Sequence, residues 1–443
     1  METASMFGAL SHTLSINQIA KMFALVDCNS FFCSVEKAFH PGLDGKAVCV
    51  LSSNDGCIVA LTPEAKALGL HRGDPIFKVR DIVDHNDVVL FSTNMYLYAA
   101  MSKRVTNILR NSIYHVENYS IDESFCWLDG YERCYDIEEY MRSVANKIKI
   151  WTDIPVSVGI APSKTLAKMG SKFAKQYKGY RSVCMIDTED KRRKALELFD
   201  LSDVWGVGRR TFEKLNYYGI HTALQFADKS ESWVRSHFNL PTIRTWRELN
   251  GIPCIDTAEV IQNQSICTSR SFGEMVTDLS HLEESVATFA GSCANKLRGQ
   301  RSVATTITVF ITSNRFREDL QQYANAQTLT LPVATSDTLE ITKGALSILR
   351  EIYQPGICYK KSGVILSGIS NAKVIQQSLF DQIKNRPQRK ELMNAIDDLN
   401  HRYGLKSIRL AVEGEGQLPW QVKCEHRSGN YLSNINEILT INI

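Results

Sequence analysis

Two adjacent carboxylates, Asp122 and Glu123, lie inside a run of β-branched and aromatic residues from His115 to Leu128. Such a run predicts two short strands joined by a tight turn. Carboxylates at the apex of a hairpin repel each other unless a positive charge lies between them. The pair is therefore either a solvated turn or part of a divalent metal site, because hard oxygen ligands suit Mg²⁺ and Mn²⁺. A metal site needs a third carboxylate from another part of the chain.

Asp27 is a candidate for that third carboxylate, because it ends the apolar strand that begins at Phe23. The order strand, helix, hairpin, helix, strand over residues 23–160 predicts a split βαβ, ferredoxin-like sheet. In such a sheet, the end of a central strand and the apex of a neighbouring hairpin lie close together. The alternative is that Asp27 caps the helix that follows it.

Three carboxylates at one end of a sheet can hold two divalent ions about 3.5–4 Å apart, the arrangement used for in-line phosphoryl displacement. The backbone carbonyl of Cys28 could add another hard ligand. One ion would lower the pKa of an attacking hydroxyl, and the other would neutralise charge on the leaving pyrophosphate. The carboxylates together predict phosphoryl or nucleotidyl transfer.

Lys164 and Lys168 follow the apolar strand 156–160 and open a predicted helix. They lie one helical turn apart and share a face, where they could contact a triphosphate or a primer phosphate. The glycines of a P-loop are absent from this segment. The alternative is an exposed lysine face on a solvated helix.

Gly206-Val207-Gly208 precedes Arg209 and Arg210 and a helical run. A Gly-Val-Gly between two short helices lets backbone N–H groups approach a phosphate at a helix N-terminus. This is the helix-hairpin-helix mode of holding a nucleic-acid backbone without reading its sequence. The segment fails as a dinucleotide fingerprint, because the third glycine and the preceding strand are missing.

The bulk composition limits the possible classes of protein. A chain of 443 residues is expected to form two to four domains, and its net charge of +3 makes any nucleic-acid surface a local one. The twelve cysteines include no C-x-x-C pair, which argues against a zinc ribbon and favours reduced thiols in a cytoplasmic protein. We expect no membrane span, and residues 1–21 are expected to be a disordered extension or an upstream start to a chain that begins at Met22.

Residues 256–372 have the order β-α-β-β-α-β, which again predicts a ferredoxin-like domain. The segment holds 10 Lys and Arg against 11 Asp and Glu, so the domain as a whole is not basic. DNA binding would require one strand face with a local positive charge. The candidate residues for this face are Arg270, Arg298, Arg301 and Arg315.

The segment from Gln376 to Phe380, Gln-Gln-Ser-Leu-Phe, follows the last predicted strand. A glutamine followed by a Leu-Phe pair suits docking of a short peptide into an apolar groove. The alternative is an amphipathic segment that packs on its own chain.

Six motifs in this order and spacing resemble family Y translesion DNA polymerases, and more narrowly the UmuC group, the catalytic subunit of DNA polymerase V and its plasmid-borne relatives. They are FALVDCNSFF, NDGC, EAKALG, YSIDESF, GIAPSKTLAK and DVWGVGRR. The resemblance runs from Met22 to about the end of the chain. It implies an α+β multidomain, right-hand polymerase with a ferredoxin-like palm, small fingers, a helical thumb with a helix-hairpin-helix, and a ferredoxin-like little finger.

The expected limits of these domains follow from the motifs. We expect palm and fingers over residues 22–190, with the fingers at about 32–90. The thumb is expected over 191–255, the little finger over 256–372, and a C-terminal tail with a clamp-binding motif over 373–443.

The resemblance also implies roles for single residues. Asp27, Asp122 and Glu123 would bind two Mg²⁺ ions, with Mn²⁺ as an alternative, and the Cys28 carbonyl would assist. Asp122 and Glu123 would be the catalytic pair, with Asp122 expected to bridge both ions and Glu123 to serve the ion that activates the primer hydroxyl. Phe32 falls on the steric gate, the aromatic side chain that excludes a ribose 2′-hydroxyl.

Further positions match basic and backbone contacts of the family. Lys66 falls on a basic position of the fingers that reaches the triphosphate, and Lys168 matches a lysine that contacts the nucleotide's phosphates. Pro63 stands where many relatives have a tyrosine that hydrogen-bonds the phosphates, so that contact is expected to be absent. The expected DNA-binding residues are Gly206, Gly208, Arg209 and Arg270.

The tail motif resembles the pentapeptide that binds the β sliding clamp, with Gln376, Leu379 and Phe380 as anchors. Gln377 replaces the usual leucine, which is expected to weaken docking. The implied partners are primer-template DNA, dNTPs, the sliding clamp, a UmuD′-like dimer and a RecA filament.

The sequence therefore predicts an error-prone, template-directed DNA polymerase that acts in translesion synthesis and the SOS response. Two alternatives remain open at this point. One is a nucleotidyl cyclase on a palm-like sheet, against which the Gly-Val-Gly hairpin argues. The other is an inactive scaffold that binds DNA and the clamp, against which the three carboxylates and Phe32 argue.

Overall fold

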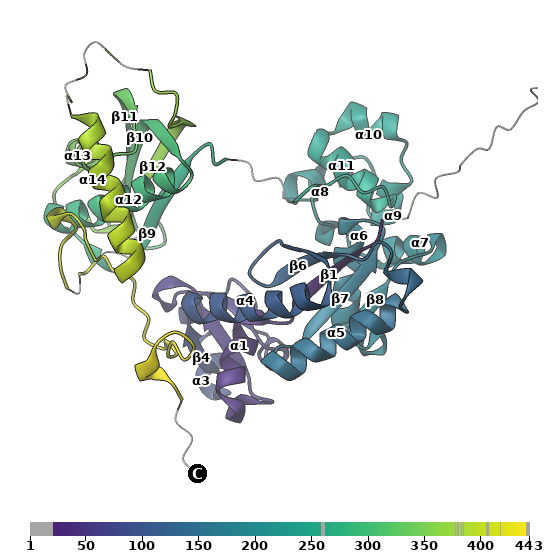
Figure 1. Ribbon diagram of the computed structural model, residues 1–443. Helices are drawn as coiled ribbons and strands as arrows, with labels where there is room; N and C mark the ends of the chain where they lie inside the picture. Colours follow the sequence, from purple (N-terminus) through teal and green to yellow (C-terminus); the bar gives the residue numbers. More distant parts are fainter. Residues whose placement is uncertain are drawn as a thin grey trace, which may run out of the picture.

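The computed structural model describes residues 21–257, 262–376, 378, 381, 383, 385–404, 407–416 and 418–439. The chain folds into a central palm with fingers on one side, a helical thumb above it and a second β-sheet domain, the little finger, opposite the thumb (Figure 1). The exact limits of the four predicted domains stay a prediction.

A five-stranded sheet forms the palm, in the order β5-β6-β1-β7-β8. Its strands are β1 (Phe23–Cys28), β5 (His115–Asn118), β6 (Glu123–Trp127), β7 (Val156–Ala161) and β8 (Val183–Met185). β1 pairs antiparallel with β6 on one side and with β7 on the other. Strands β1, β5, β6 and β7 make the predicted ferredoxin-like arrangement, and β8 extends it parallel to β7.

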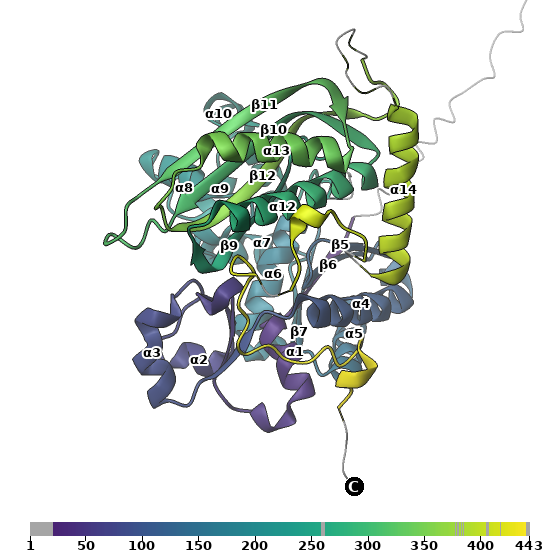
Figure 2. The same ribbon diagram turned by 90° about the vertical axis from the view of Figure 1, so that its left-hand side faces the viewer.

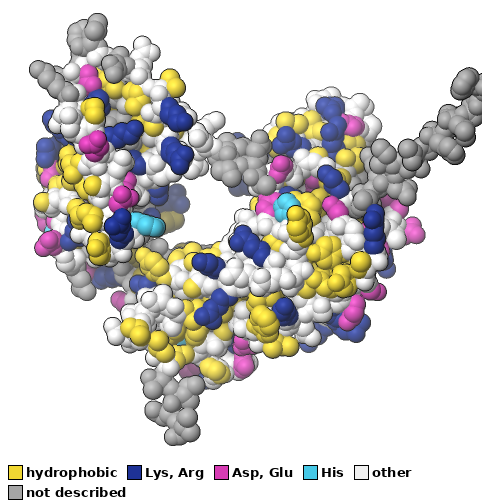
Figure 3. Space-filling view, viewed as in Figure 1, with side chains coloured by type: hydrophobic (Ala, Val, Ile, Leu, Met, Phe, Trp, Pro, Cys, Tyr) yellow, Lys and Arg dark blue, Asp and Glu magenta, His cyan; other side chains and the backbone are white. Residues whose placement is uncertain are grey.

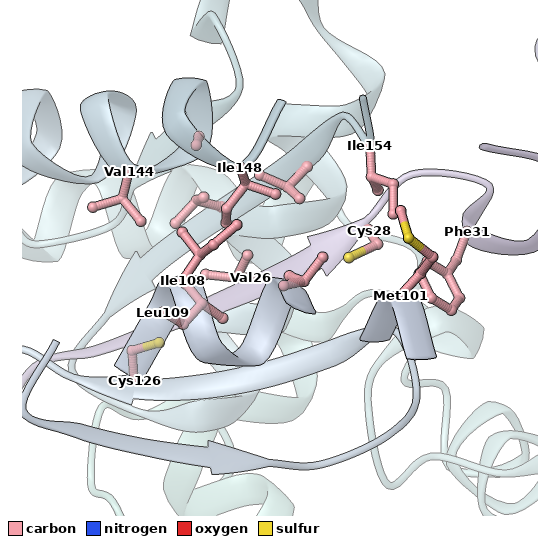
Figure 4. Close-up of a cluster of buried hydrophobic side chains, with 14 of the residues drawn as sticks. Val26, Cys28, Phe31, Met101, Ile108, Leu109, Cys126, Val144, Ile148 and Ile154 are labelled. Carbon is pink, nitrogen blue, oxygen red and sulfur yellow. The ribbon is translucent and has the colours of Figure 1, made fainter. Parts of the chain in front are cut away.

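Helices cover both faces of the palm sheet, because alternate residues of β1 are apolar on opposite faces. Ala24 and Val26 pack against α1 (Phe31–Phe39), α4 (Met95–Ser112) and α5 (Ile137–Thr152), as Figure 4 shows for part of this core. Phe23 and Leu25 pack on the other face with α6 (Lys164–Gln176) and with thumb residues. A sheet covered on both faces leaves mainly the ends of its strands for chemistry.

The fingers are an insertion between α1 and α4 with a small sheet of their own. Its strands are β2 (Val48–Leu51), β3 (Ile58–Leu61) and β4 (Val89–Ser92), in the order β3-β2-β4, and its helices are α2 (Pro63–Ala67) and α3 (Ile76–His85). β2 and β3 form the predicted hairpin, and Asn54 and Asp55 take left-handed backbone conformations at its turn. Thr62 caps α2, and Pro63 occupies its first turn.

The thumb is built from helices that share a core with the α6 face of the palm sheet. They are α7 (Glu189–Leu198), α8 (Arg209–Tyr217), α9 (Ala223–Ala227), α10 (Glu231–His237) and α11 (Leu240–Leu249). Asn239 caps α11, and the buried Trp246 of that helix donates its indole N–H to the carbonyl of Ala227 (3.1 Å). The thumb helices are therefore tied to one another, and their apolar side chains continue the core beneath α6.

The little finger has the predicted order β-α-β-β-α-β. Its elements are β9 (Ile266–Val276), α12 (Leu279–Gly299), β10 (Ser302–Ser313), β11 (Ala324–Thr335), α13 (Thr338–Ile352) and β12 (Tyr359–Asn371). The sheet order is β11-β10-β12-β9, and α12 and α13 cover one of its faces. The other face is open, so the same element order has produced a different kind of sheet from that of the palm.

The C-terminal part begins with α14 (Arg386–Tyr403), which lies beside the little finger (Figure 1). The chain then passes from the little finger to the fingers and palm. Short 3₁₀ helices lie at Pro41–Leu43, Ser53–Asp55, Tyr131–Arg133, Lys178–Tyr180, Leu201–Asp203, Ala411–Glu413 and Ile435–Glu437. Among the described residues, no helix has the length and apolar character needed to cross a membrane.

Candidate active site

The ends of β1 and β6 bring the three predicted carboxylates together. Asp27 is the register partner of Glu123, and the backbone N–H of Cys28 donates to the carbonyl of Asp122 (2.9 Å). Asp27 does not cap the helix that follows it, because Ser30 occupies the N-cap position of α1. The predicted convergence of a strand end and a hairpin is confirmed, and the alternative that Asp27 caps the next helix is wrong. Metal binding by the three carboxylates stays a prediction.

Each carboxylate is held by a neighbouring polar side chain. The ammonium of Lys175 lies 3.4 Å from Asp27, and that of Lys168 lies 2.6 Å from Glu123. The hydroxyl of Ser120 donates to Asp122 (2.5 Å) and accepts from the backbone N–H of Asp122 and of Glu123. Ser120 therefore fixes the carboxylate of Asp122 and the backbone of the turn, and helix α6 supplies one lysine to Asp27 and one to Glu123.

The three neighbouring carboxylates repel one another and are stabilised by nearby positive charge. Burial raises the pKa of Asp27, Lys175 lowers it, and the negative charges of Glu123 and Asp122 raise it further. Three carboxylates at this spacing are therefore unfavourable unless cations compensate them. Lys175 and Lys168 do so in part.

The donor set fits hard divalent cations, although the side chains are turned to their lysine and serine partners. In the described part of the chain, no three His, Cys, Asp or Glu side chains are already arranged to hold a metal ion. The oxygens of Asp27, Asp122 and Glu123 border the same cavity as Cys28, and carboxylate with backbone carbonyl is the ligand chemistry that Mg²⁺ and Mn²⁺ take. The three side chains are half-buried rather than sealed, so Asp27 and Glu123 can exchange their lysine partners for a cation.

A cavity of about 770 Å³ joins these carboxylates to the fingers. Phe32 lies on its wall at the start of α1, and Lys66 reaches it from α2. Arg72 of the fingers and Lys175 of α6 also line it. The cavity has acidic groups at one end and basic groups along the fingers, the distribution expected for a triphosphate with bound cations.

Sequence reasoning missed Arg72 and Lys175. Lys175 lies seven residues after Lys168, two helical turns along the same face of α6, so the spacing alone could have indicated it. Arg72 follows a glycine-closed helix in a loop, and no local pattern distinguishes it from a solvated arginine.

The two lysines predicted at the start of α6 lie in different environments. Lys168 borders a second cavity of about 300 Å³ between α6 and the thumb, beneath the rings of Tyr119 and Trp205, and does not line the larger cavity with Phe32 and Lys66. Lys164 is buried and forms an ion pair with Glu117 (3.2 Å). The prediction that Lys164 contacts a phosphate is wrong, because the side chain is enclosed by its partners.

The Gly-Val-Gly segment lies where a helix-hairpin-helix was predicted, between the 3₁₀ helix Leu201–Asp203 and α8. Gly206 has φ +93°, and an added Cβ would lie 2.2 Å from the Thr245 hydroxyl, so only glycine fits there. Gly208 is the N-cap of α8 and is exposed, with open space around it. Arg209 is exposed and pairs with Glu213 on its own helix (2.8 Å).

The four arginines predicted on one strand face of the little finger are not gathered there. Arg298 forms a two-point ion pair with Asp397 of α14, on the helical side of the domain, so its prediction as a DNA contact is wrong. Arg270 is exposed on the edge strand β9, where its register partner Ser362 faces α12. Arg301 and Arg315 lie in exposed loops at opposite ends of β10.

Gln376, the first anchor of the predicted clamp motif, is exposed after β12. Leu379 and Phe380 lie outside the described residues. The clamp motif therefore stays a prediction.

Solved structures with the same architecture identify the fold. A chimera of the Y-family DNA polymerases Dbh and Dpo4 is similar to this chain with a TM-score of 0.61, at 21% identity, over 79% of this chain and 99% of the other. An insertion ternary complex of Dbh DNA polymerase is similar with a TM-score of 0.50, at 20% identity and the same coverage. The fold is that of the Y-family DNA polymerases.

Sequence relatives narrow this class. The chain matches the impB/mucB/samB family over residues 26–172 and the C-terminal domain of that family over 263–379, and it matches a domain of unknown function over 390–441. It is 39% identical to the UmuC protein of Salmonella typhimurium strain LT2 over 95% of this chain and 100% of that protein. It is 40% identical to the ImpB protein of Salmonella typhimurium over 94% of this chain and 99% of that protein. The chain belongs to the impB/mucB/samB family, as its resemblance to the UmuC group implied.

Proposed function

We propose that this chain is an error-prone, template-directed DNA polymerase that carries out translesion synthesis in the SOS response. The observation that carries the proposal is the larger cavity, where three carboxylates at the ends of β1 and β6 face Phe32 and the basic residues of the fingers and α6. A dNTP fits this distribution of charge, with its triphosphate toward Lys66, Arg72 and Lys175 and its sugar against Phe32. In the reaction, the primer 3′-hydroxyl attacks the α-phosphate and pyrophosphate leaves.

Asp27, Asp122, Glu123 and the backbone carbonyl of Cys28 are the proposed ligands for two Mg²⁺ ions, with Mn²⁺ as an alternative. When bound, these ions would supply the charge stabilisation and the lowered hydroxyl pKa that nucleotidyl transfer needs. Lys175 and Lys168 hold the carboxylates in place before the ligands arrive. Lys175 is then free to turn toward the triphosphate that occupies the same cavity.

The rest of the chain supplies a place for primer and template. Figure 3 shows a hollow between the little finger and the thumb above the palm, with Lys and Arg side chains along its little-finger side. We propose that the Gly206–Gly208 turn and Arg209 hold one DNA backbone, and that Arg270 meets the other from the edge of β9. A nucleotidyl cyclase has no use for this hollow, which favours the polymerase.

The small fingers account for the low fidelity. They consist of a three-stranded sheet and two short helices, and this unit is too small to close over the nucleotide and test the shape of the base pair. We propose that the open fingers admit damaged templates for this reason.

Several partners belong to the proposal and depend on the family alone. They are the β sliding clamp at Gln376, Leu379 and Phe380, a UmuD′-like dimer and a RecA filament. We propose a cytoplasmic location for this activity, with association with the nucleoid when the chain is active.

Primer extension with Mg²⁺ across a template abasic site tests the polymerase and its carboxylates together. The unaltered chain is expected to extend, and Asp122→Ala is expected to lose at least about a hundredfold in rate, because several kcal/mol of charge stabilisation depend on the site. Asp44→Ala removes an exposed aspartate at the rim of the fingers and is the matched control. Equal extension by Asp122→Ala and the unaltered chain would refute the site.

A further inference from the structure

The segment 418–432, here called the C-terminal strap, runs from the little finger to the palm (yellow in Figure 2). Trp420 is buried at its start against Phe289 of α12, with ring centroids 5.8 Å apart. The carbonyl of Gln421 accepts from the backbone N–H of Gly273, which adds the strap to the exposed edge of β9 (3.0 Å). The strap lies within the match to a domain of unknown function.

The strap is next held by the fingers. The side-chain amide of Asn54 donates to the carbonyl of Ser271 in the little finger (2.9 Å), and its oxygen accepts from the backbone N–H of Lys423 in the strap (2.9 Å). His426 exchanges two hydrogen bonds with Ser92 at the end of β4. Little finger, strap and fingers are thus joined at one place.

At its palm end the strap is seated by a fully buried asparagine. Asn94 caps α4 and donates to the carbonyls of Ser428 (3.0 Å) and Gly429 (3.3 Å). A buried amide with these partners fixes the backbone of the strap at Ser428. The position of the Ser428 hydroxyl is therefore determined by the palm.

The Ser428 hydroxyl donates to Glu36, a carboxylate buried inside the palm. Glu36 Oε1 accepts from Ser428 Oγ (3.0 Å) and from the hydroxyl of Tyr98 (2.6 Å), and within the described chain Oε2 has no hydrogen-bond partner. Burial raises the pKa of Glu36, and the hydrogen bonds from Tyr98 and Ser428 lower it. A buried carboxylate with few partners depends strongly on each of them.

The ring of Tyr98 packs directly against the ring of Phe32. The two rings are stacked, with centroids 4.4 Å apart and an interplanar angle of 16°. Tyr98 is fully buried in α4, whereas Phe32 is half-buried and lines the nucleotide cavity. The hydroxyl bond to Glu36 holds the far end of the Tyr98 ring in place. The ring stacked against it, Phe32, therefore has a fixed support, which limits how far Phe32 can withdraw from the cavity.

We propose that Ser428 of the C-terminal strap is a positioning residue for sugar selection: it holds Glu36, Glu36 holds Tyr98, and Tyr98 supports the ring of Phe32. The inference deepens the proposed function and rests on it, because its effect is read at the sugar of the incoming nucleotide. Loss of the Ser428 hydroxyl frees Tyr98, so Phe32 yields more easily to a ribose 2′-hydroxyl. Part of the domain of unknown function thereby acquires a role in the nucleotide pocket.

The test compares insertion of dNTP and rNTP by the full chain, as the ratio of the two kcat/KM values. Ser428→Ala is expected to lower this ratio about fivefold, which is the factor that the net free energy of one hydrogen bond contributes to an equilibrium constant. The rate of dNTP insertion should be nearly unchanged. Tyr98→Phe, which keeps the ring and removes the hydroxyl, is expected to do the same. Ser428→Thr keeps a hydroxyl and should retain the ratio, and Ser433→Ala, at an exposed serine of the same region, is the matched control.

Phe32→Ala is the reference that separates the inference from the proposed function. If Phe32→Ala lowers the ratio of the kcat/KM values while Ser428→Ala and Tyr98→Phe leave it unchanged, the inference is overturned and the proposed polymerase function stands. If Ser428→Ala reduces dNTP and rNTP insertion equally, the residue has a structural role and the inference is again overturned. If the unaltered chain extends no primer, the proposed function fails and the inference falls with it.

Discussion

The palm and the little finger have the same order of strands and helices along the chain, but their strands are arranged in a different order within the sheet. In the palm, β1 lies between β6 and β7, so the first strand is central. In the little finger, β12 lies between β9 and β10, so the last strand takes the inner place. The palm sheet is buried on both faces, whereas helices cover one face of the little-finger sheet and leave the other open.

This difference decides which part of each sheet is available for function. In the palm, the pairing of β1 with β6 sets Asp27 opposite Glu123 at the end of the sheet. In the little finger, the open face carries hydroxyl pairs such as Thr308 with Thr328 (2.7 Å), and the ring of Phe310 lies across Gly363. A sheet covered on both faces can place reactive side chains only at the ends of its strands. A sheet with one open face presents an extended surface that suits a DNA backbone.

A glycine in each sheet tests how constrained the two sheets are, and the larger effect is expected in the palm. A Cβ at Gly159 of β7 would lie 1.9 Å from the carbonyl of Ala167 and 2.1 Å from the backbone N of Ser171, both in α6. Backbone cannot yield as a side chain does, so Gly159→Ala is expected to lower the free energy of unfolding by about 3 kcal/mol or more. Urea unfolding measures this loss, and Gly179→Ala, with open space around it, is the control.

The matching change in the little finger is Gly363→Ala. Its Cβ would lie 2.4 Å from the Phe310 ring and 2.6 Å from the Cβ of Ser269 on the edge strand β9. The ring can swing into the open side and an edge strand can shift, so the expected loss is about 1 kcal/mol. Equal losses for Gly159→Ala and Gly363→Ala in urea unfolding would show that the open sheet is as constrained as the covered one.

The convergence of the carboxylates could be predicted from the sequence, because it follows from element order. A strand that ends in Asp27 and a hairpin with Asp122 and Glu123 at its apex meet in any ferredoxin-like sheet. The ferredoxin-like palm followed for the same reason, whereas the right-hand polymerase architecture came from the resemblance to family Y polymerases. The strand order of the little finger could not be derived, because both sheet orders satisfy the same sequence of strands and helices.

The charged residues were less predictable, because their partners are chosen by tertiary packing. Lys164 and Arg298 have the sequence pattern of exposed cations, yet Glu117 and Asp397, from distant elements, enclose them. Lys175 was missed because a lysine in the last turn of a helix ordinarily caps it. The strap gave no signal, since an extended segment held by backbone hydrogen bonds has no hydrophobic periodicity.

Buried polar groups give a third test of the comparison between palm and little finger, with the smallest expected effect. The palm buries a titratable group, Glu36 with Tyr98 and Ser428, whereas the little finger buries two neutral hydroxyls, Ser285 and Ser362, 2.9 Å apart. Stability should therefore depend on pH through Glu36 and not through the serine pair. The measurement is the free energy of unfolding of Glu36→Gln and Ser362→Ala, relative to the unaltered chain, from about pH 5 to pH 8.

The sign follows from the raised pKa of Glu36 in the folded protein. Above the usual pKa of glutamate the unfolded chain has released the proton that the folded chain still holds, so stability falls as pH rises through the folded pKa. Glutamine does not titrate and still accepts from Tyr98, so Glu36→Gln should gain stability relative to the unaltered chain as pH rises. The nearby His40, which lowers the pKa of Glu36, is present in both chains. Ser362→Ala should instead show a constant loss of about 1 kcal/mol at every pH, because it removes one neutral hydrogen bond. A pH-independent difference for Glu36→Gln would mean that the palm buries this group without cost, as the little finger does its hydroxyls.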